Sequence, residues 1–234
     1  LGEIKRKQQE KLKEYGLQKA IGLDNEYVKV LSYIEYCGVY LDPQKWKAKC
    51  QEDKINMEKA KKVLDDLLLA EPDKFRKYID NQYDMFSTGF STKVNWNSEK
   101  QVIPLMKELG IDTQVKDKKS GLMKDSIEKG VIKPQADKHK IVNLYLKYKE
   151  YQKEVSTYGE NWFDYINPVT RRIHTNYTQI MNTGRLSSGQ KGRPKSGVPQ
   201  LPNMQNVPAE DRTRSCFTAQ GKDNTLIVAD YSGQ

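Results

Sequence analysis

Asp230 carries the carboxylate best placed for chemistry in this sequence. It follows the apolar stretch LIVA, residues 226–229, and precedes Tyr231 within LIVADYSGQ. A short apolar run of this kind predicts a buried strand, so the carboxylate would be held rigidly at the strand end. Two roles are open to such a group: its oxygens bind a hard cation such as Mg²⁺, or they cap a helix or turn.

Residues 171–208 form a window that is basic and polar but contains no Asp or Glu, although 30% of the chain is charged. Its six basic residues are Arg171, Arg172, Arg185, Lys191, Arg193 and Lys195. Arg, Asn and Gln side chains supply hydrogen-bond donors to sugar–phosphate backbones and minor-groove edges. The window therefore predicts a nucleic-acid surface, and a solvated basic loop is the alternative.

The composition favours the same class of partner. The 40 Lys and Arg against 31 Asp and Glu leave a net charge of +9, which suits a polyanion, with a solvated lysine-rich surface as the alternative. Cys37, Cys50 and Cys216 match no zinc or redox spacing, and we expect Cys50 to be a buried, reduced thiol. The sequence contains no apolar run long enough for a membrane span and no signal peptide. Leu1 and Gln234 both look like cut ends, so we expect a fragment of a longer protein.

Helical patterns dominate the first two-thirds of the chain. The sequence Asp42-Pro43 predicts a helix start, with Asp as the N-cap, followed by an apolar stripe of about 28 residues. A basic tip is expected over residues 112–125 and irregular structure over 73–98. The expected helices cover residues 1–19, 25–37, 43–70, 99–109 and 137–158.

After Tyr158 the helical periodicity disappears. INPVTRRIHTNYTQI, residues 166–180, predicts a turn at Asn167-Pro168 followed by a strand. The chain is therefore expected to be α+β, with a helical part followed by the start of a sheet.

Several motifs, in this order, resemble family A (polymerase I-type) DNA polymerases. They are HTNYTQIMNTGRLSS, PNMQNVP, RTRSCF and LIVADYS, and the upstream segments VNWNSEKQ and VSTYGENW extend the resemblance. Any one motif is weak, but their order and spacing together are specific. The resemblance implies a mainly helical thumb followed by the first strands of an antiparallel palm. The implied domains are the end of an exonuclease-like domain, the thumb and the beginning of the palm, at residues 1–22, 23–160 and 161–234.

The resemblance implies DNA-directed addition of deoxynucleotides to a primer 3′-hydroxyl. Asp230 would be the catalytic, metal-binding carboxylate, and the backbone carbonyl of Tyr231 would contact a metal. Two Mg²⁺ ions would be shared with carboxylates outside this chain. The implied partners are primer–template DNA, deoxynucleoside triphosphates and a second chain or downstream segment that completes the palm and fingers. The implied location is the cytoplasm of a bacterial or phage-infected cell.

Candidate DNA contacts follow from the same resemblance. Arg185 would reach the minor groove at the primer end, where its planar fork suits acceptors common to all base pairs. His174 would have a structural or DNA-proximal role. The other candidates are Thr183, Ser187, Asn203, Gln205, Asn206, Arg212 and Arg214 beside the active site, and Asn95, Asn97, Lys118, Lys119, Ser120, Ser156 and Thr157 in the thumb. Turn chemistry, helix capping and surface ion pairs are the alternatives for these residues.

The sequence departs from the family pattern after the candidate carboxylate. DYSGQ stands where the family usually has DYSQIE, so Gly233 and Gln234 place sugar discrimination in question. The insertion GQKGRPKSGVPQL, residues 189–201, is longer than usual. Two other functions remain open: a non-catalytic duplex-binding fragment of a decayed or split polymerase, and an RNA polymerase-like enzyme suggested by Ser232-Gly233.

Overall fold

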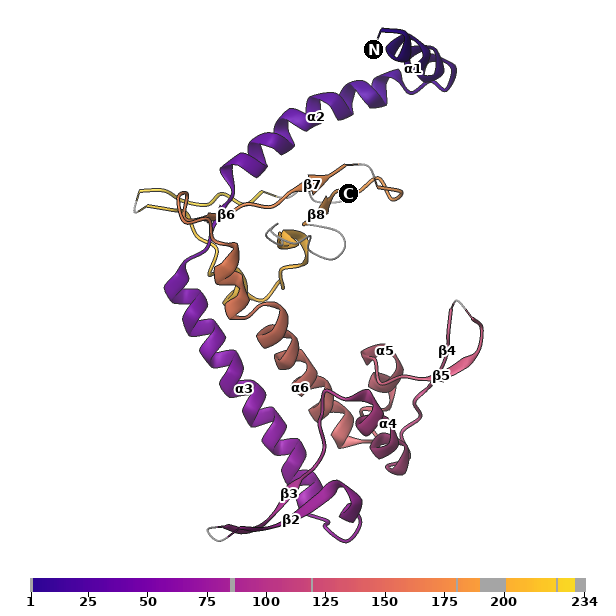
Figure 1. Cartoon of the computed structure of the whole chain (residues 1–234), viewed down its shortest axis with the longest axis vertical. Coiled ribbons are helices and arrows are strands. Elements are labelled where there is room, and N and C mark those ends of the chain that lie inside the picture. The colour runs from indigo at the N-terminus through magenta and orange to yellow at the C-terminus, as the bar shows by residue number, and fades with distance from the viewer. Residues whose placement is uncertain are drawn as a thin grey trace. The chain divides into compact units, whose positions relative to one another are not determined.

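The computed structural model describes residues 2–84, 87–118, 120–179, 181–189, 201–221 and 223–229, with the backbone alone for 81–84 and 87–90. The described chain forms two compact units. The first, which we call the split unit, combines residues 1–49 with residues 160–234, and the second, the continuous unit, is residues 50–159. Figure 1 labels their helices and strands.

Two helices begin the split unit, α1 (Gly2–Glu14) and α2 (Gln18–Cys37). The expected helix start after Asp24 is wrong, because α2 begins at Gln18 and runs through this aspartate. An exposed Asp inside a helix costs at most about 0.7 kcal/mol, which is too little to end it. The expected end is confirmed, since the backbone turns at Gly38 and its N–H donates to the Ile34 carbonyl.

The region after α2 joins chain segments that are far apart in sequence. Strand β1 (Val39–Tyr40) pairs antiparallel with β6 (Arg172–Ile173), and Leu41 bridges to Phe217. Gly38 has a φ of 58°, and a Cβ at this position would lie 2.8 Å from the His174 ring. Glycine thus fits both the left-handed backbone and the close approach of the ring.

Three aromatic rings pack against one another in the split unit. The ring centroids of Trp46 and Trp162 are 5.1 Å apart, and Phe217 lies 6.0 Å from Trp46 and 5.9 Å from Trp162. Trp162 belongs to the short helix η3 (Glu160–Tyr165). The remaining short elements of the unit are β7 (Tyr177–Thr178), β8 (Ser187–Ser188), η4 (Met204–Asn206) and α7 (Asp211–Arg214).

Helix α3 (Pro43–Leu69) begins in the split unit and continues through the first part of the continuous unit. The predicted start is confirmed, since Asp42 Oδ1 accepts hydrogen bonds from the backbone N–H groups of Gln44 and Lys45 at 2.9 and 3.1 Å. Such capping satisfies N–H groups that have no partner inside the helix. Cys50 is buried and forms no disulfide within the described residues, as its place in the apolar stripe predicted.

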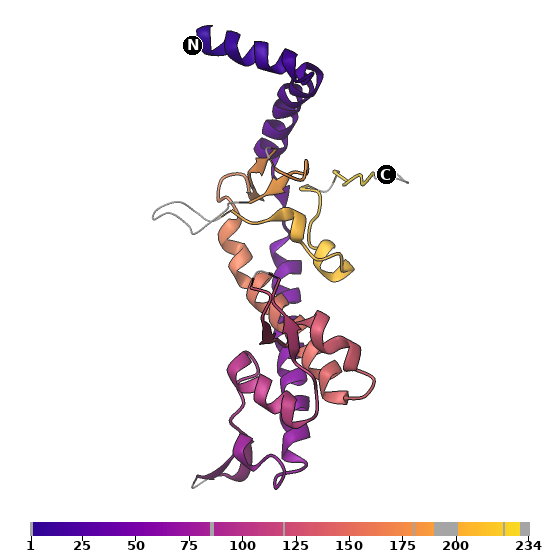
Figure 2. The same ribbon diagram turned by 90° about the vertical axis from the view of Figure 1, so that its right-hand side faces the viewer.

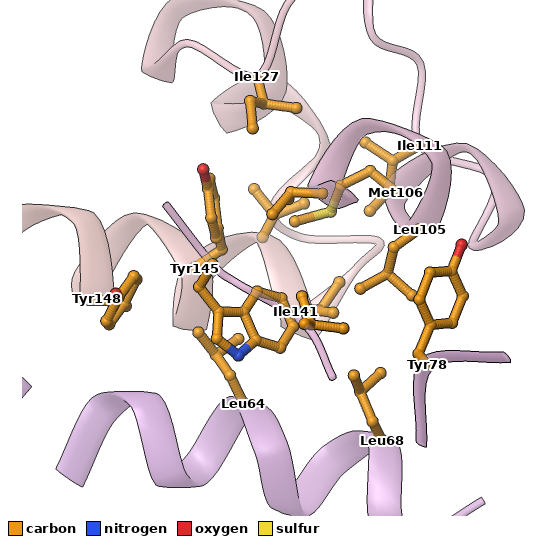
Figure 3. Close-up of a cluster of buried hydrophobic side chains, with 14 of the residues drawn as sticks. Leu64, Leu68, Tyr78, Leu105, Met106, Ile111, Ile127, Ile141, Tyr145 and Tyr148 are labelled. Atoms are coloured by element: carbon orange, nitrogen blue, oxygen red, sulfur yellow. The ribbon is translucent and has the colours of Figure 1, made fainter. Parts of the chain in front are cut away.

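The continuous unit has its own hydrophobic core, shown in Figure 3. Leu64 and Leu68 come from α3, Leu105 and Met106 from α4 (Glu99–Glu108), and Tyr145 from α6 (Lys140–Thr157). Within this unit α3 and α6 lie side by side in both Figure 1 and Figure 2. The helices at residues 99–108 and 140–157 confirm the predicted ones, because their apolar residues recur at helical spacing.

Two hairpins and a short helical segment complete the continuous unit. Strands β2 (Ile79–Asp84) and β3 (Ser87–Thr92) form one antiparallel pair, after η1 (Arg76–Tyr78). This hairpin falls where irregular structure was expected. Strands β4 (Gln114–Lys116) and β5 (Met123–Asp125) form the second, within the predicted basic tip. The short helices are α5 (Lys129–Ile132) and η2 (Lys133–Gln135).

The predicted α+β class is confirmed: long helices are combined with short antiparallel strand pairs. The expected buried strand over LIVA is wrong for residues 226–229. They form no regular element, and Leu226, Ile227 and Val228 are 55%, 88% and 92% exposed. A strand requires a neighbouring strand for its backbone groups, and none of the described strands pairs with this segment. The expected domain boundaries after residues 22 and 160 remain predictions. Within the described chain, no helix has the length and apolar character needed to cross a membrane.

Candidate nucleic-acid interface

Strands β7 and β8 hold one group of candidate residues together in the split unit. The Ser188 N–H donates to Gln205 Oε1 at 2.8 Å, and the Met204 N–H donates to Ser188 Oγ at 3.1 Å. Thr175 Oγ1 adds a buried bond of 2.7 Å to the Pro202 carbonyl. The β7–β8 hairpin is thereby attached to η4, although they are separate in sequence.

This attachment brings six of the predicted DNA-binding residues onto neighbouring elements. Gly184, with φ of 69°, makes a turn closed by a bond from its N–H to the Met181 carbonyl at 3.0 Å. Arg185 follows this turn and is exposed, and Ser187 lies on β8. The six residues are Thr183, Arg185, Ser187, Asn203, Gln205 and Asn206.

Some of these side chains already have partners within the protein. Asn203 Oδ1 accepts from the Gln205 N–H at 3.0 Å, and Gln205 Oε1 accepts from Ser188. The turn chemistry considered as the alternative for Asn203 and Gln205 is therefore present. Arg185 differs from these two residues. It is exposed, and the turn before it is closed by a backbone hydrogen bond that does not use the arginine side chain.

His174 is held on both sides of its ring. Its Nδ1 lies 2.8 Å from the Glu35 carbonyl oxygen and its Nε2 lies 2.7 Å from Thr170 Oγ1. A carbonyl only accepts, so Nδ1 carries a hydrogen and donates it to the Glu35 carbonyl oxygen. The ring thus joins α2 to the segment that leads into β6, which is the structural role considered for it.

The two candidate arginines near α7 also have partners. Arg212 Nε lies 2.7 Å from Glu210 Oε2, and Arg214 Nε donates to the Pro208 carbonyl at 3.2 Å. Arg214 is exposed and Arg212 partly so. Arg212 therefore makes the surface ion pair weighed as its alternative, and most of the Arg214 fork still faces solvent.

A second group of candidates lies in the continuous unit, at the start of α4. Asn95 Oδ1 accepts from the Asn97 N–H at 3.0 Å, which orders the turn before α4. Asn97 Oδ1 in turn accepts from Lys149 Nζ on α6 at 3.3 Å, and Gln152 Oε1 accepts from the same ammonium at 3.1 Å. Asn97 is thereby placed beside a lysine that the sequence did not single out.

Asn97 and Lys149 line a groove of about 640 Å³ on the continuous unit. Its charged residues are five lysines and three glutamates, namely Lys129, Lys133, Lys147, Lys149, Lys153, Glu99, Glu128 and Glu150. Lysines thus outnumber acids along an open surface, which suits a polyanion. Lys149 and Lys153 lie four residues apart on α6, so their spacing indicates one helix face. That spacing is the feature of the sequence that could have indicated this basic face.

Burial shifts the pKa values of Lys149 and Tyr145 in this groove and of Tyr148 on the same helix. Desolvation lowers the pKa of the Lys149 ammonium, and the charge of Glu99 partly opposes the change. Desolvation raises the pKa of Tyr145 and of Tyr148. Lys149 accordingly gives up its proton more readily than a fully solvated lysine.

The basic tip is shaped by an aspartate. Asp117 Oδ1 accepts from the Ser120 N–H at 3.0 Å, and Asp117 Oδ2 lies 2.7 Å from Lys124 Nζ. Lys118 and Ser120 are exposed at this turn, and Lys119 lies outside the described residues. The turn therefore presents Lys118 to solvent while Asp117 engages the Lys124 charge.

Ser156 and Thr157 lie in the last turn of α6 and are exposed. Ser156 Oγ donates to the Lys153 carbonyl at 3.5 Å, a long bond within the helix. Asp230 and Tyr231 lie outside the described residues, and so do Gly233 and Gln234. No group of three His, Cys, Asp or Glu that suits a metal occurs in the described part of the chain.

Comparison with known proteins gives one family. The family model for DNA polymerase family A matches residues 65–234. The chain is 32% identical over 165 residues to DNA polymerase I of Bacillus subtilis, which covers 68% of this chain and 17% of that protein. It is 37% identical over 145 residues to the thermostable DNA polymerase I of Thermus aquaticus, covering 59% of this chain and 16% of that protein.

A solved structure has a similar fold. It is the POL domain of Pol1 from M. smegmatis in complex with DNA primer-template and dNTP, with a TM-score of 0.58 and 19% identity. The match covers 82% of this chain and 28% of that chain. The chain thus spans less than a third of the solved polymerase domain and under a fifth of the two curated relatives.

Proposed function

The chain belongs to DNA polymerase family A, and on this premise we propose that it is part of a DNA-directed DNA polymerase. The whole enzyme would add deoxynucleotides to a primer 3′-hydroxyl, as directed by a template. The continuous unit and the β7–β8 region would hold the primer–template duplex. Further sequence or a second chain would supply the rest of the palm and the fingers, and the bacterial relatives support a cytoplasmic site of action in bacteria.

The observation that carries this proposal is the lysine groove with its Asn97–Lys149 hydrogen bond. Two features support a duplex backbone as its occupant. Its charge comes from flexible ammonium groups, which neutralise phosphates without reading sequence. Asn97 adds a polar amide at the edge of the same groove.

Arg185 is proposed to contact the minor groove close to the primer end, with Thr183 and Ser187 beside it. Support comes from its exposure and from the attachment of β7–β8 to η4, which carries Gln205 and Asn206 and follows Asn203. Asn95, Lys118, Lys119, Ser120, Ser156, Thr157, Arg212 and Arg214 are proposed as backbone contacts. His174 is proposed to position β6 rather than to bind DNA directly, since both ring nitrogens are engaged.

The catalytic part of the proposal rests on Asp230 and the carbonyl of Tyr231. With carboxylates outside this chain they would hold two Mg²⁺ ions, whose chemistry is to activate the primer hydroxyl and neutralise the triphosphate. Whole enzyme with Asp230→Ala should bind primer–template normally and extend it by orders of magnitude less. Near-normal extension would remove Asp230 from the mechanism.

The duplex-binding part can be tested on the protein directly. Fluorescence anisotropy with a labelled primer–template hairpin should give an affinity that falls with salt. For Lys149→Ala/Lys153→Ala the slope of log K against log salt should decrease by about 2, since each phosphate contact contributes about 0.9. Lys61→Ala/Lys62→Ala removes the same charge from exposed positions on α3 and serves as the control.

Equal effects of the two double variants would mean that only net charge matters, and the groove would not be the binding site. Binding without extension by the whole enzyme would favour the alternative, a non-catalytic duplex-binding fragment of a decayed or split polymerase. Extension with ribonucleotides in preference to deoxynucleotides would favour the RNA polymerase-like enzyme and would implicate Gly233.

A further inference from the structure

Arg171 has an unusual backbone conformation. Its φ is 61°, and it is the sole non-glycine residue with positive φ in the part of the chain that the structure describes. In this region the Cβ of an L-residue crowds the following carbonyl oxygen, so the position favours glycine. An arginine here is held at a cost in stability.

The surrounding turn imposes this conformation. Asn167 Oδ1 accepts from the N–H groups of Val169 and Thr170 at 2.9 and 3.1 Å. The Arg171 N–H donates to the Asn167 carbonyl at 2.9 Å, and the Asn167 N–H donates to the Arg172 carbonyl at 2.9 Å. None of these bonds uses the Arg171 side chain. Any residue at this position would meet the same backbone requirement.

Arg172, the next residue, has a structural role, because its side chain bonds to other parts of the unit. Arg172 Nε donates to Gln220 Oε1 at 2.8 Å, and a terminal guanidinium nitrogen donates to the Cys37 carbonyl at 2.9 Å. The Arg171 side chain is exposed, and within the described residues no hydrogen bond or ion pair engages it. Packing and internal bonding therefore do not explain why an arginine occupies this turn.

The charge of Arg171 is also not neutralised by nearby sequence. Along the chain, the closest acidic residues are Asp164 before it and Glu210 after it. A strained backbone kept at an exposed, uncompensated cation indicates that the side chain is retained for an external ligand. In a basic window without acids, that ligand is an anion.

We propose that Arg171 binds a phosphate of the nucleic-acid backbone held by the split unit. This inference rests on the duplex-binding part of the proposed function. The planar guanidinium donates two parallel hydrogen bonds to phosphate oxygens, which orients the duplex without reading its sequence. Arg172 fixes β6, the strand that directly follows Arg171.

The test compares Arg171→Gly, Arg171→Asn and Arg171→Lys in the 234-residue chain. Glycine and asparagine both tolerate the left-handed conformation and remove the charge, while lysine keeps the charge and loses the fork. Arg171→Gly should lower the equilibrium constant for unfolding in urea about two- to fivefold, because strain relief exceeds the entropy penalty of glycine. Both neutral variants should bind a primer–template hairpin several-fold more weakly, with a salt slope reduced by about 1.

Arg171→Lys should retain most of the salt slope but bind more weakly than the native protein. Native affinity and salt slope in both neutral variants would overturn the inference, as would an unfolding constant for Arg171→Gly that does not fall. Parallel measurement of Lys149→Ala/Lys153→Ala separates the two proposals. If Lys149→Ala/Lys153→Ala weakens binding as expected and the neutral Arg171 variants do not, this inference alone is refuted. If the native protein fails to bind the hairpin, the proposed function is refuted.

Discussion

The continuous unit and the split unit are held together by different interactions. Among its described residues, the continuous unit buries a cluster of 17 apolar side chains, drawn from α3, α4, α6 and the segments between them. In the described part of the split unit the buried apolar residues are few: Leu31, Leu41, Trp46, Trp162, Ile173 and Cys216. Its distant segments are joined instead by bonds such as Tyr177 N–H to Glu35 Oε1 at 2.6 Å.

The difference shows how each unit places candidate DNA contacts. The hydrophobic core fixes α4 and α6, and the groove lysines extend from α6 and from α5–η2. In the split unit, directional hydrogen bonds fix single backbone positions, and the candidates lie on short hairpins and turns. Hydrophobic burial therefore positions the groove of the continuous unit, whereas hydrogen bonds position the candidate residues of the split unit.

Matched leucine truncations should give the largest effects and test this comparison directly. Leu105 and Leu41 are both fully buried, the first in the apolar cluster and the second in the split unit. Leu105→Ala should lower the free energy of unfolding by about 3–5 kcal/mol, and Leu41→Ala by about 2–3 kcal/mol, because a smaller core relaxes more easily around the cavity. Urea denaturation followed by circular dichroism measures both, and equal losses would contradict the comparison.

Removal of a polar link should damage the split unit more than removal of a surface charge. Glu35→Ala leaves the Tyr177 N–H without its charged acceptor, and we expect a loss of about 2 kcal/mol. Glu26→Ala is the control on the same helix, since Glu26 is 72% exposed in a pair with Lys29, and it should cost less than about 1 kcal/mol. The free energy of unfolding measures both, and losses of equal size would mean that the bond to Tyr177 contributes little.

Loss of the N-cap of α3 should have a smaller effect. Asp42→Ala removes the acceptor for the Gln44 and Lys45 N–H groups, at a cost of about 1 kcal/mol. Asp42→Asn should recover most of that loss, because its amide oxygen still caps the helix. Thermal unfolding of the two variants distinguishes capping from charge, and an asparagine variant as unstable as the alanine variant would favour charge.

Acid should open the basic tip locally, with the smallest effect on the whole molecule. The Lys107 ammonium, and then the Thr113 hydroxyl, lower the pKa of Asp125 by hydrogen bonding to its carboxylate. The folded pKa is thus below the unfolded one, so the stabilisation is present above the ordinary Asp pKa and is lost as pH falls through the folded value.

Hydrogen exchange of the β4–β5 amides between pH 7 and pH 3, corrected for intrinsic exchange rates, measures this opening. Protection should fall with acid in the native protein. In Asp125→Asn it should be lower at pH 7 and nearly independent of pH. The same acid dependence in both proteins would show that another group controls the tip.

Local signals allowed accurate prediction of much of the helical part. The Asp42-Pro43 start and the apolar stripe predicted a helix of about 28 residues, and α3 has 27. The β2–β3 hairpin was missed, because FSTGFST reads as turn-rich and its pairing depends on the partner strand. The prediction of a buried strand over LIVA was wrong for a related reason, since apolar character does not supply a neighbouring strand.

The candidate site was predicted only in part. Arg185 and Gln205 were predicted from separate motifs, and the structure attaches their elements through Ser188. The groove lysines were missed, because they come from α5, η2 and α6 and meet only through the fold. The positive φ of Arg171 could not be predicted from the residue type, because the surrounding turn imposes it.

The pairing of β1 with β6 has a consequence for synthesis on the ribosome. Val39 on β1 pairs with Ile173 on β6. The whole continuous unit lies between them and can bury its core as soon as it emerges, since domains generally fold as units in the order of translation. Strand β1 has to wait for residues 172–173 to emerge, so the split unit is completed only after the continuous unit has been synthesised.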